Sequence, residues 1–275
     1  MSFLGAAAHA QPAAVILGVP YDATSTFRRG SALAPQAIRW ASQSIETYSP
    51  VLRRDLESVR YDDGGDLDVD GATPEIVADA VRDAVAGTAP GALPVLLGGE
   101  HTLTLGAVQA LAARHPDLAV VQLDAHTDLR DEYEGRKVSH ATVMRRIMEA
   151  VPPERIVALG IRAGTGEEFA LAGRYRACSP RLSVRSEIWR WLQDRPVYVT
   201  IDIDAVDPSD APGTGNPEPE GIAAGDLLAF LRRLADLPVA GVDLVEVSPP
   251  YDPSGRTAVL AAVIIREVVL ALRGG

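Results

Sequence analysis

The chain has 275 residues, of which 47% are apolar and 23% are charged, and this composition is typical of a globular protein with a substantial core. The formal net charge of −11 argues against a nucleic-acid partner, because binding phosphates needs clustered positive charge. The single cysteine, Cys178, excludes an internal disulfide, and the apolar stretches are too short or too charged to cross a membrane. We therefore expect a soluble, cytoplasmic protein.

Short apolar runs alternate along the chain with segments that have helical periodicity. The runs predict strands at 13–19, 58–63, 93–98, 118–125, 155–161, 197–203 and 239–247. The periodic segments predict helices at 34–43, 74–87, 103–114, 140–150, 182–193, 224–235 and 257–273. Because the runs are apolar on both faces and no linker divides the chain, we expect one α/β domain over residues 1–275 with a mostly parallel sheet.

Polar residues collect where these predicted strands end. The set comprises His101 in "GGEH", Asp124, His126 and Asp128 in "DAHTD", Asp202 and Asp204 in "DIDAVD", and Glu246 in "VEVSPP". If the strands continue through these motifs, their period of two places Asp124, His126 and Asp128 on one face, and likewise Asp202 and Asp204. Ligands of parallel sheets bind outside the carboxyl ends of the strands, so we expect one shared site.

Two imidazoles and four carboxylates predict a metal centre. Four carboxylates cannot share a small site as bare anions, whereas two divalent cations would balance them. Nitrogen and oxygen ligands without a thiolate suit Mn²⁺, with Fe²⁺, Co²⁺ or Zn²⁺ as alternatives. A single DxD or DxH motif is more often a turn, a cap or a solvated pair, but three such motifs at strand ends favour the metal.

The motifs "GGEHT", "DAHTD", "SHATVMRR" and "DIDAVDPSDAPGTGNPEPEG" resemble those of the ureohydrolase family, which includes arginases and agmatinases. The resemblance extends to residues 18–39 and 245–252, and it implies the arginase-like fold, a single three-layer αβα domain. It also implies two Mn²⁺ per subunit. One would be bound by His101, Asp124, Asp128 and Asp202, and the other by Asp124, His126, Asp202 and Asp204.

The resemblance implies hydrolysis of a small cationic guanidino compound to urea and an amine. Metal ions lower the pKa of the water that they bind, which supplies a nucleophile for the guanidinium carbon. Asp128 would hold and relay a proton, Glu246 would pair with the guanidinium, and His140 would carry a proton to the leaving amine. A pKa near neutrality would suit His140 to that role, although a histidine at a helix start can also be a plain surface residue.

The segment "LRDEYEGRKV" (129–138) resembles the agmatinase version of this loop, and its Asp131, Glu132 and Glu134 suit a substrate with an amine tail. Glu220 stands where agmatinase-like sequences have glycine, which indicates either a longer polyamine substrate or neutral drift.

We expect conversion of agmatine to putrescine. The alternatives are an N1-aminopropylagmatine ureohydrolase (forming spermidine), a guanidinobutyrase, an arginase, a different dinuclear hydrolase such as a phosphoesterase, or a non-catalytic structural or regulatory family member. The resemblance also implies a homotrimer or homohexamer, which the nearly uncharged C-terminal helix permits.

Overall fold

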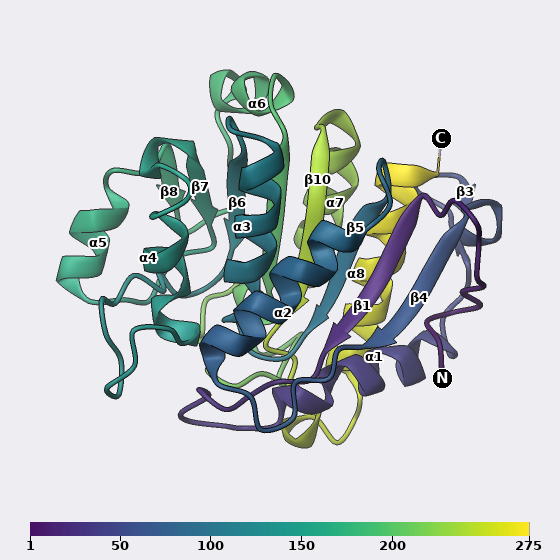
Figure 1. Cartoon of the computed structure of the whole chain (residues 1–275), viewed down its shortest axis with the longest axis horizontal. Coiled ribbons are helices and arrows are strands. Elements are labelled where there is room, and N and C mark those ends of the chain that lie inside the picture. The colour runs from purple at the N-terminus through teal and green to yellow at the C-terminus, as the bar shows by residue number, and fades with distance from the viewer. Residues whose placement is uncertain (275) are drawn as a thin grey trace.

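The structure, a computed structural model, describes residues 1–274 and contains a central sheet of eight strands (Figure 1). All neighbouring strands of this sheet are parallel. Their spatial order is β4 (Tyr61–Asp66), β1 (Ala14–Val19), β5 (Leu93–Gly98), β10 (Val239–Val245), β9 (Val197–Asp202), β6 (Ala119–Leu123), β7 (Ile156–Leu159) and β8 (Ala177–Ser179). The mostly parallel sheet predicted from the apolar runs is therefore confirmed.

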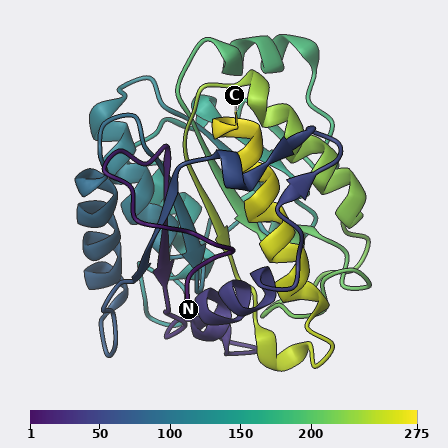
Figure 2. The ribbon, with the colours of Figure 1, turned by 90° about the vertical axis from the view of Figure 1, so that its right-hand side faces the viewer.

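Helices cover both faces of the sheet, which makes the three-layer αβα arrangement that we expected (Figures 1 and 2). One face carries α1 (Ala34–Ser42), α6 (Ser186–Gln193), α7 (Ala224–Arg232) and α8 (Arg256–Arg273). The other carries α2 (Pro74–Gly87), α3 (Leu103–Arg114), α4 (Val143–Ile147) and α5 (Gly166–Ala172). Every residue of β5 is buried, and alternate residues serve the two layers: Val95 and Leu97 join one hydrophobic cluster and Leu96 the other.

The nearly uncharged C-terminal helix, α8, packs inside its own chain against α1 and α7. Its two central charges are paired, because the fully buried Glu267 accepts hydrogen bonds from Arg266, Arg232 and Ser49. The apolar sequence of α8 is therefore accounted for by the core of one chain, and it carries no information on assembly.

Several predicted boundaries differ from the structure. The strand expected at 58–63 begins at Tyr61, because the Asp55 side chain accepts a hydrogen bond from the Glu57 N–H and starts a 3₁₀ turn at Leu56–Ser58. The helix expected at 140–150 splits into a 3₁₀ turn (His140–Thr142) and α4. Helix α5, strand β8 and the antiparallel pair β2 (Tyr48–Ser49) and β3 (Arg54–Asp55) were not predicted.

The start of α5 has a sequence signal that our prediction missed. Its first turn carries a capping box in which Thr165 and Glu168 bond each other's backbone N–H groups, and Thr-x-x-Glu is a sequence signature of a helix start.

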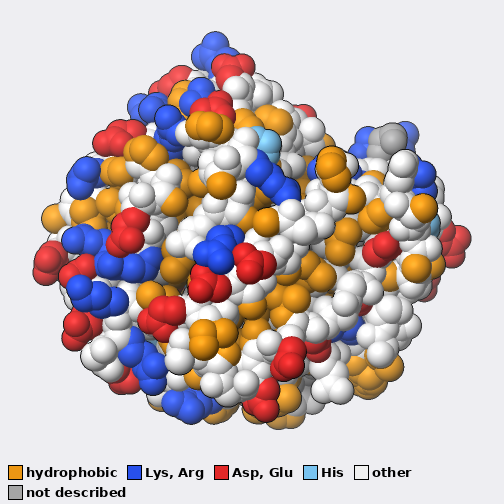
Figure 3. Space-filling view, viewed as in Figure 1, with side chains coloured by type: hydrophobic (Ala, Val, Ile, Leu, Met, Phe, Trp, Pro, Cys, Tyr) orange, Lys and Arg blue, Asp and Glu red, His pale blue; other side chains and the backbone are white. Residues whose placement is uncertain are grey.

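Figure 3 shows acidic and basic side chains interspersed over the face that it displays, with apolar side chains between them. Among residues 1–274, no helix has the length and apolar character needed to cross a membrane.

Candidate metal centre

The predicted metal ligands and Glu246 lie at or after the ends of four strands that are neighbours in the middle of the sheet. In spatial order, β5 leads to His101, β10 to Glu246, β9 ends at Asp202, and β6 leads to Asp124. The carboxyl ends of parallel strands lie at the same edge of a sheet, so this order brings the side chains together. The convergence expected from sequence is thus present.

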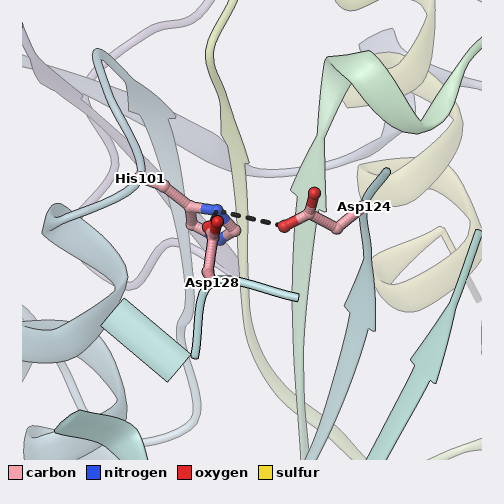
Figure 4. A group of neighbouring side chains, drawn as sticks. All are labelled: His101, Asp124 and Asp128. Carbon is pink, nitrogen blue, oxygen red and sulfur yellow. Dashed lines mark ion pairs between the residues drawn. The ribbon is translucent and has the colours of Figure 1, made fainter. Parts of the chain in front are cut away.

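One group of possible ligands consists of His101, Asp124 and Asp128 (Figure 4). The Nδ1 atom of His101 lies 3.0 Å from Asp128 Oδ2, 3.4 Å from Asp124 Oδ2 and 3.6 Å from Asp202 Oδ2. This nitrogen is buried and forms no hydrogen bond with any described residue, although it faces three carboxylates. A buried nitrogen without a partner, surrounded by acidic oxygens, fits a cation between them.

The second group consists of Asp124, His126 and Asp204, so Asp124 belongs to both. His126 Nδ1 lies 2.9 Å from Asp204 Oδ2 and 3.8 Å from Asp124 Oδ1. On the other edge of the ring, His126 Nε2 lies 3.6 Å from Glu218 Oε1. The arrangement offers a histidine nitrogen and shared carboxylate oxygens to each of two adjacent ions.

The chain reaches this geometry by turns, and our expectation that the strands continue through the motifs was wrong. Strand β6 ends at Leu123, where Asp124 Oδ1 accepts a hydrogen bond of 2.6 Å from the His126 N–H. In the same way, Asp202 Oδ1 accepts one of 2.8 Å from the Asp204 N–H. Aspartate side chains that bond the backbone two residues on compete with strand pairing, so both motifs turn at the sheet edge.

Two of the predicted site residues have left-handed backbone conformations. The φ angle is 52° at Asp128 and 65° at Glu246, and this region is disfavoured for residues other than glycine. Such strained residues cluster at functional sites, where the surroundings hold them in place. The strain marks both positions independently of the sequence motifs.

The electrostatics of the site also favour bound cations. Burial, followed by the nearby Asp124 carboxylate, raises the pKa of Asp128 to about 7. Burial and the neighbouring Asp204 and Asp124 likewise raise the pKa of Asp202 well above its usual range. The protein thus buries more negative charge than it neutralises, and two divalent ions would correct the imbalance.

A buried hydrogen-bond network supports His101 from beneath. Its Nε2 atom lies 2.8 Å from Thr200 Oγ1, which leaves Nδ1 free to act as a ligand. Asp243, below them, accepts hydrogen bonds of 2.7 Å from Thr104 and 2.6 Å from Tyr198. None of these supporting residues was predicted, because they lie inside strands and a helix whose sequences resemble ordinary core.

Four of the six candidate ligands line the floor of a cleft of about 320 Å³. Its lining includes the predicted His126, Asp128, His140, Asp202, Asp204 and Glu246, and also Glu168, Asn216 and Glu218, which were not predicted. His101 and Asp124 lie below the surface, with no exposed area.

Loop 129–138 contributes other residues to the cleft than we expected. Arg130 and Tyr133 line it, whereas Asp131 pairs with Arg146 at 2.5 Å on the surface. Neither Asp131 nor its neighbours Glu132 and Glu134 are among the lining residues. The loop acids therefore do not explain a preference for an amine tail.

Glu220 also lies outside this cleft. It borders a separate surface hollow together with Arg181 and Arg233. Its φ angle of 61° explains why a glycine suits this position, because glycine adopts the left-handed conformation without strain.

His140 lines the cleft and is 7% exposed, so it is not a plain surface residue. Burial, followed by positive charge on His101 and His126, lowers the pKa of His140 to about 4. The expectation of a pKa near neutrality was wrong, because the side chain is buried beside other cations. At neutral pH the ring is uncharged and does not repel a cationic substrate.

Comparison with known proteins agrees with these observations. Residues 12–271 match the Arginase family. An agmatinase of Bacillus anthracis is 41% identical over 262 residues, which cover 93% of this chain and 90% of that protein. Among solved structures, a putative agmatinase from Clostridium difficile has a TM-score of 0.91 at 35% identity and covers 96% of this chain and 98% of its own. The agmatine ureohydrolase of Thermoplasma volcanium has a TM-score of 0.89 at 34% identity, with coverages of 99% and 94%.

Proposed function

The chain belongs to the arginase family of metal-dependent hydrolases, and we propose that it hydrolyses agmatine to putrescine and urea. The observation that carries this proposal is the cleft whose floor combines the two groups of possible metal ligands with the buried carboxylate of Glu246. Similarity to two proteins named for agmatine indicates the substrate.

We propose two Mn²⁺ ions per subunit, held as the resemblance implies. His101, Asp124, Asp128 and Asp202 would hold one ion, and Asp124, His126, Asp202 and Asp204 the other. The distances within both groups and the unpartnered His101 Nδ1 support this assignment. When bound, the ions would lower the pKa of a water molecule and so supply a nucleophile at neutral pH.

The protein's own residues would orient the substrate and move the protons. Glu246 accepts a hydrogen bond of 3.0 Å from the His101 N–H through Oε1, and its other oxygen would receive the guanidinium, a planar donor suited to a carboxylate. Asp128, which lines the cleft, would take the proton of the attacking water. The departing amine needs a proton, and His140, uncharged at neutral pH, would relay it: its free ring nitrogen would accept the proton taken from the attacking water and pass it to the amine.

We propose that Glu218 selects the amine tail, in the role first expected for the loop acids. Its side chain is 39% exposed and lines the cleft, so it lies nearer the solvent than the ligands beneath. The distal ammonium of agmatine would be attracted there, whereas the carboxylates of arginine and guanidinobutyrate would be repelled. Glu220 was the reason for considering the longer substrate aminopropylagmatine. Because Glu220 does not line the cleft, that reason no longer applies.

The test is a comparison of kcat/KM for urea release from agmatine, aminopropylagmatine, guanidinobutyrate and arginine. We expect agmatine to exceed arginine at least about a hundredfold, which corresponds to roughly 2.7 kcal/mol of transition-state stabilisation. Glu218→Gln should reduce this ratio about tenfold or more, while the matched control Glu220→Gln should leave it unchanged. Preference for arginine would refute the proposed substrate, and absence of urea with every compound would favour a non-catalytic family member.

We also propose that the chain forms one ureohydrolase domain and works in the cytoplasm as a homotrimer or homohexamer. The single domain is supported by the sheet, in which β1 and β10 from opposite ends of the chain both flank β5.

A further inference from the structure

A buried threonine connects His140 to a glutamate that the proposed reaction does not use. Thr24 lies in the loop between β1 and α1, 116 residues before His140 in the chain. Its hydroxyl oxygen lies 2.6 Å from Glu100 Oε1, 3.1 Å from His140 Nδ1 and 3.0 Å from the backbone nitrogen of His140. All three side chains are buried, so water does not compete for these bonds.

The hydroxyl has one proton to donate and two lone pairs that accept. Its proton is donated to Glu100 Oε1, and its lone pairs face two nitrogens of His140. The backbone N–H of His140 is one donor, and Nδ1 must then carry a proton to be the other. We propose that Thr24, held by Glu100, is a positioning residue that fixes His140 with its proton on Nδ1 and the lone pair of Nε2 free.

The opposite tautomer would break this set of bonds. With Nδ1 unprotonated, Thr24 would have to turn its only proton toward the ring. The oxygens of Thr24 and Glu100 would then face each other at 2.6 Å without a proton between them, and a buried acceptor that loses its partner is costly. Only a proton on Glu100 itself would permit this reversal, and it would place the imidazole proton on Nε2.

Glu100 and the His140 ring are each held by a further contact. Glu100 Oε2 accepts a hydrogen bond of 2.8 Å from the Thr102 N–H, directly before α3 begins. On the cleft side, Tyr133 packs its ring edge to face against the imidazole, with 5.7 Å between the ring centroids. The ring is thus held at Nδ1 and by Tyr133, while Nε2 bonds no described residue.

This inference rests on the proposed function, in which His140 carries a proton. A base whose second nitrogen is oriented by a buried hydrogen-bond partner presents the correct lone pair without a preceding rotation or tautomer exchange. Thr24, in the loop after β1, and Glu100, which follows β5, would supply that orientation from buried positions.

The direct test is the tautomer itself. Long-range ¹H–¹⁵N spectra of ¹⁵N-histidine-labelled protein, loaded with diamagnetic Zn²⁺, distinguish a proton on Nδ1 from one on Nε2. With five histidines in the chain, His140→Asn identifies the signal. We expect Nδ1–H in the wild type and in Thr24→Ser, and a shift toward Nε2–H in Thr24→Val. A wild-type ring protonated on Nε2 would overturn the inference without any variant.

Kinetics provide the second readout. Thr24→Val should lower kcat for agmatine at least about tenfold with little change in KM, because general acid–base groups contribute about 10²–10⁴-fold. Thr24→Ser should restore most of this loss. In a His140→Asn background, Thr24→Val should cause no further loss, since its effect acts through the imidazole. An equal loss in both backgrounds would mean a structural role only.

The two hypotheses fail separately. If the wild type releases no urea from any guanidino compound, the proposed function fails, but the spectrum still decides the tautomer.

Discussion

Replacing Glu220 by glycine should stabilise the protein and leave its substrate preference unchanged. Glu220 has a φ angle of 61°, which costs a residue with a side chain about 1–2 kcal/mol. Glycine removes this strain but gains roughly 0.4–1 kcal/mol of freedom in the unfolded chain. We therefore expect the free energy of unfolding to rise by about 1 kcal/mol, and the melting temperature to rise by about 2–4 °C.

The assay is urea denaturation followed by circular dichroism, with an unchanged m-value as the sign that only stability has changed. Glu220→Ala is the matched control, because it removes the carboxylate and keeps the strain, so it should give no gain. A loss of stability in Glu220→Gly would refute the argument from the backbone. A fall in kcat/KM for aminopropylagmatine without a fall for agmatine would show that Glu220 does contact a polyamine.

Three further predictions concern stability, catalysis and assembly. Asp63→Asn should lower the free energy of unfolding by about 2 kcal/mol, because the buried Arg39 loses its two-bond carboxylate partner and keeps only Asp66. Burial raises the pKa of Asp63, but the hydrogen bonds from Arg39, Phe3 and Gly65 outweigh it and hold that pKa below its usual value. The Asp63 contribution is therefore present above about pH 4 and lost as the pH falls through the folded-state pKa, so the variant should show a flatter acid limb in a stability–pH profile. Glu246→Gln should lower kcat/KM for agmatine by at least about a hundredfold while metal content stays constant, and an unchanged kcat/KM would remove Glu246 from guanidinium binding. Light scattering at working concentration should give the mass of a trimer or hexamer, and the mass of a single chain would contradict the proposed assembly.

Strands that are buried on both faces were predictable because their sequences are continuous apolar runs, whereas the short strands β2, β3 and β8 were not predicted. Strand β5 begins and ends where the sequence indicates, and α2 and α3 also match their predicted ranges. The strand order was not predictable: β10 and β9 lie between β5 and β6, and no local pattern encodes which strands become neighbours. That order is nevertheless what brings His101, Asp124 and Asp202 into one site.

The direction of side chains in irregular segments was the main feature that the sequence could not predict. Glu218 and Glu220 are separated by one proline, yet one borders the cleft and the other a separate hollow. The left-handed backbone at Glu220 takes this segment out of any regular repeat, so periodicity cannot assign a face. Thr24 and Glu100 were hidden for another reason, because their partnership with His140 joins parts of the chain that only the fold brings together.

The central claim is that the acidic floor of the cleft holds two manganese ions, and anomalous diffraction tests it most directly. Crystals grown with Mn²⁺ would be measured at X-ray energies on either side of the manganese absorption edge. We predict two anomalous peaks per subunit, one among His101, Asp124, Asp128 and Asp202, and the other among His126, Asp124, Asp202 and Asp204. A single ion, or none, among these residues in a preparation that releases urea from agmatine would contradict the claim.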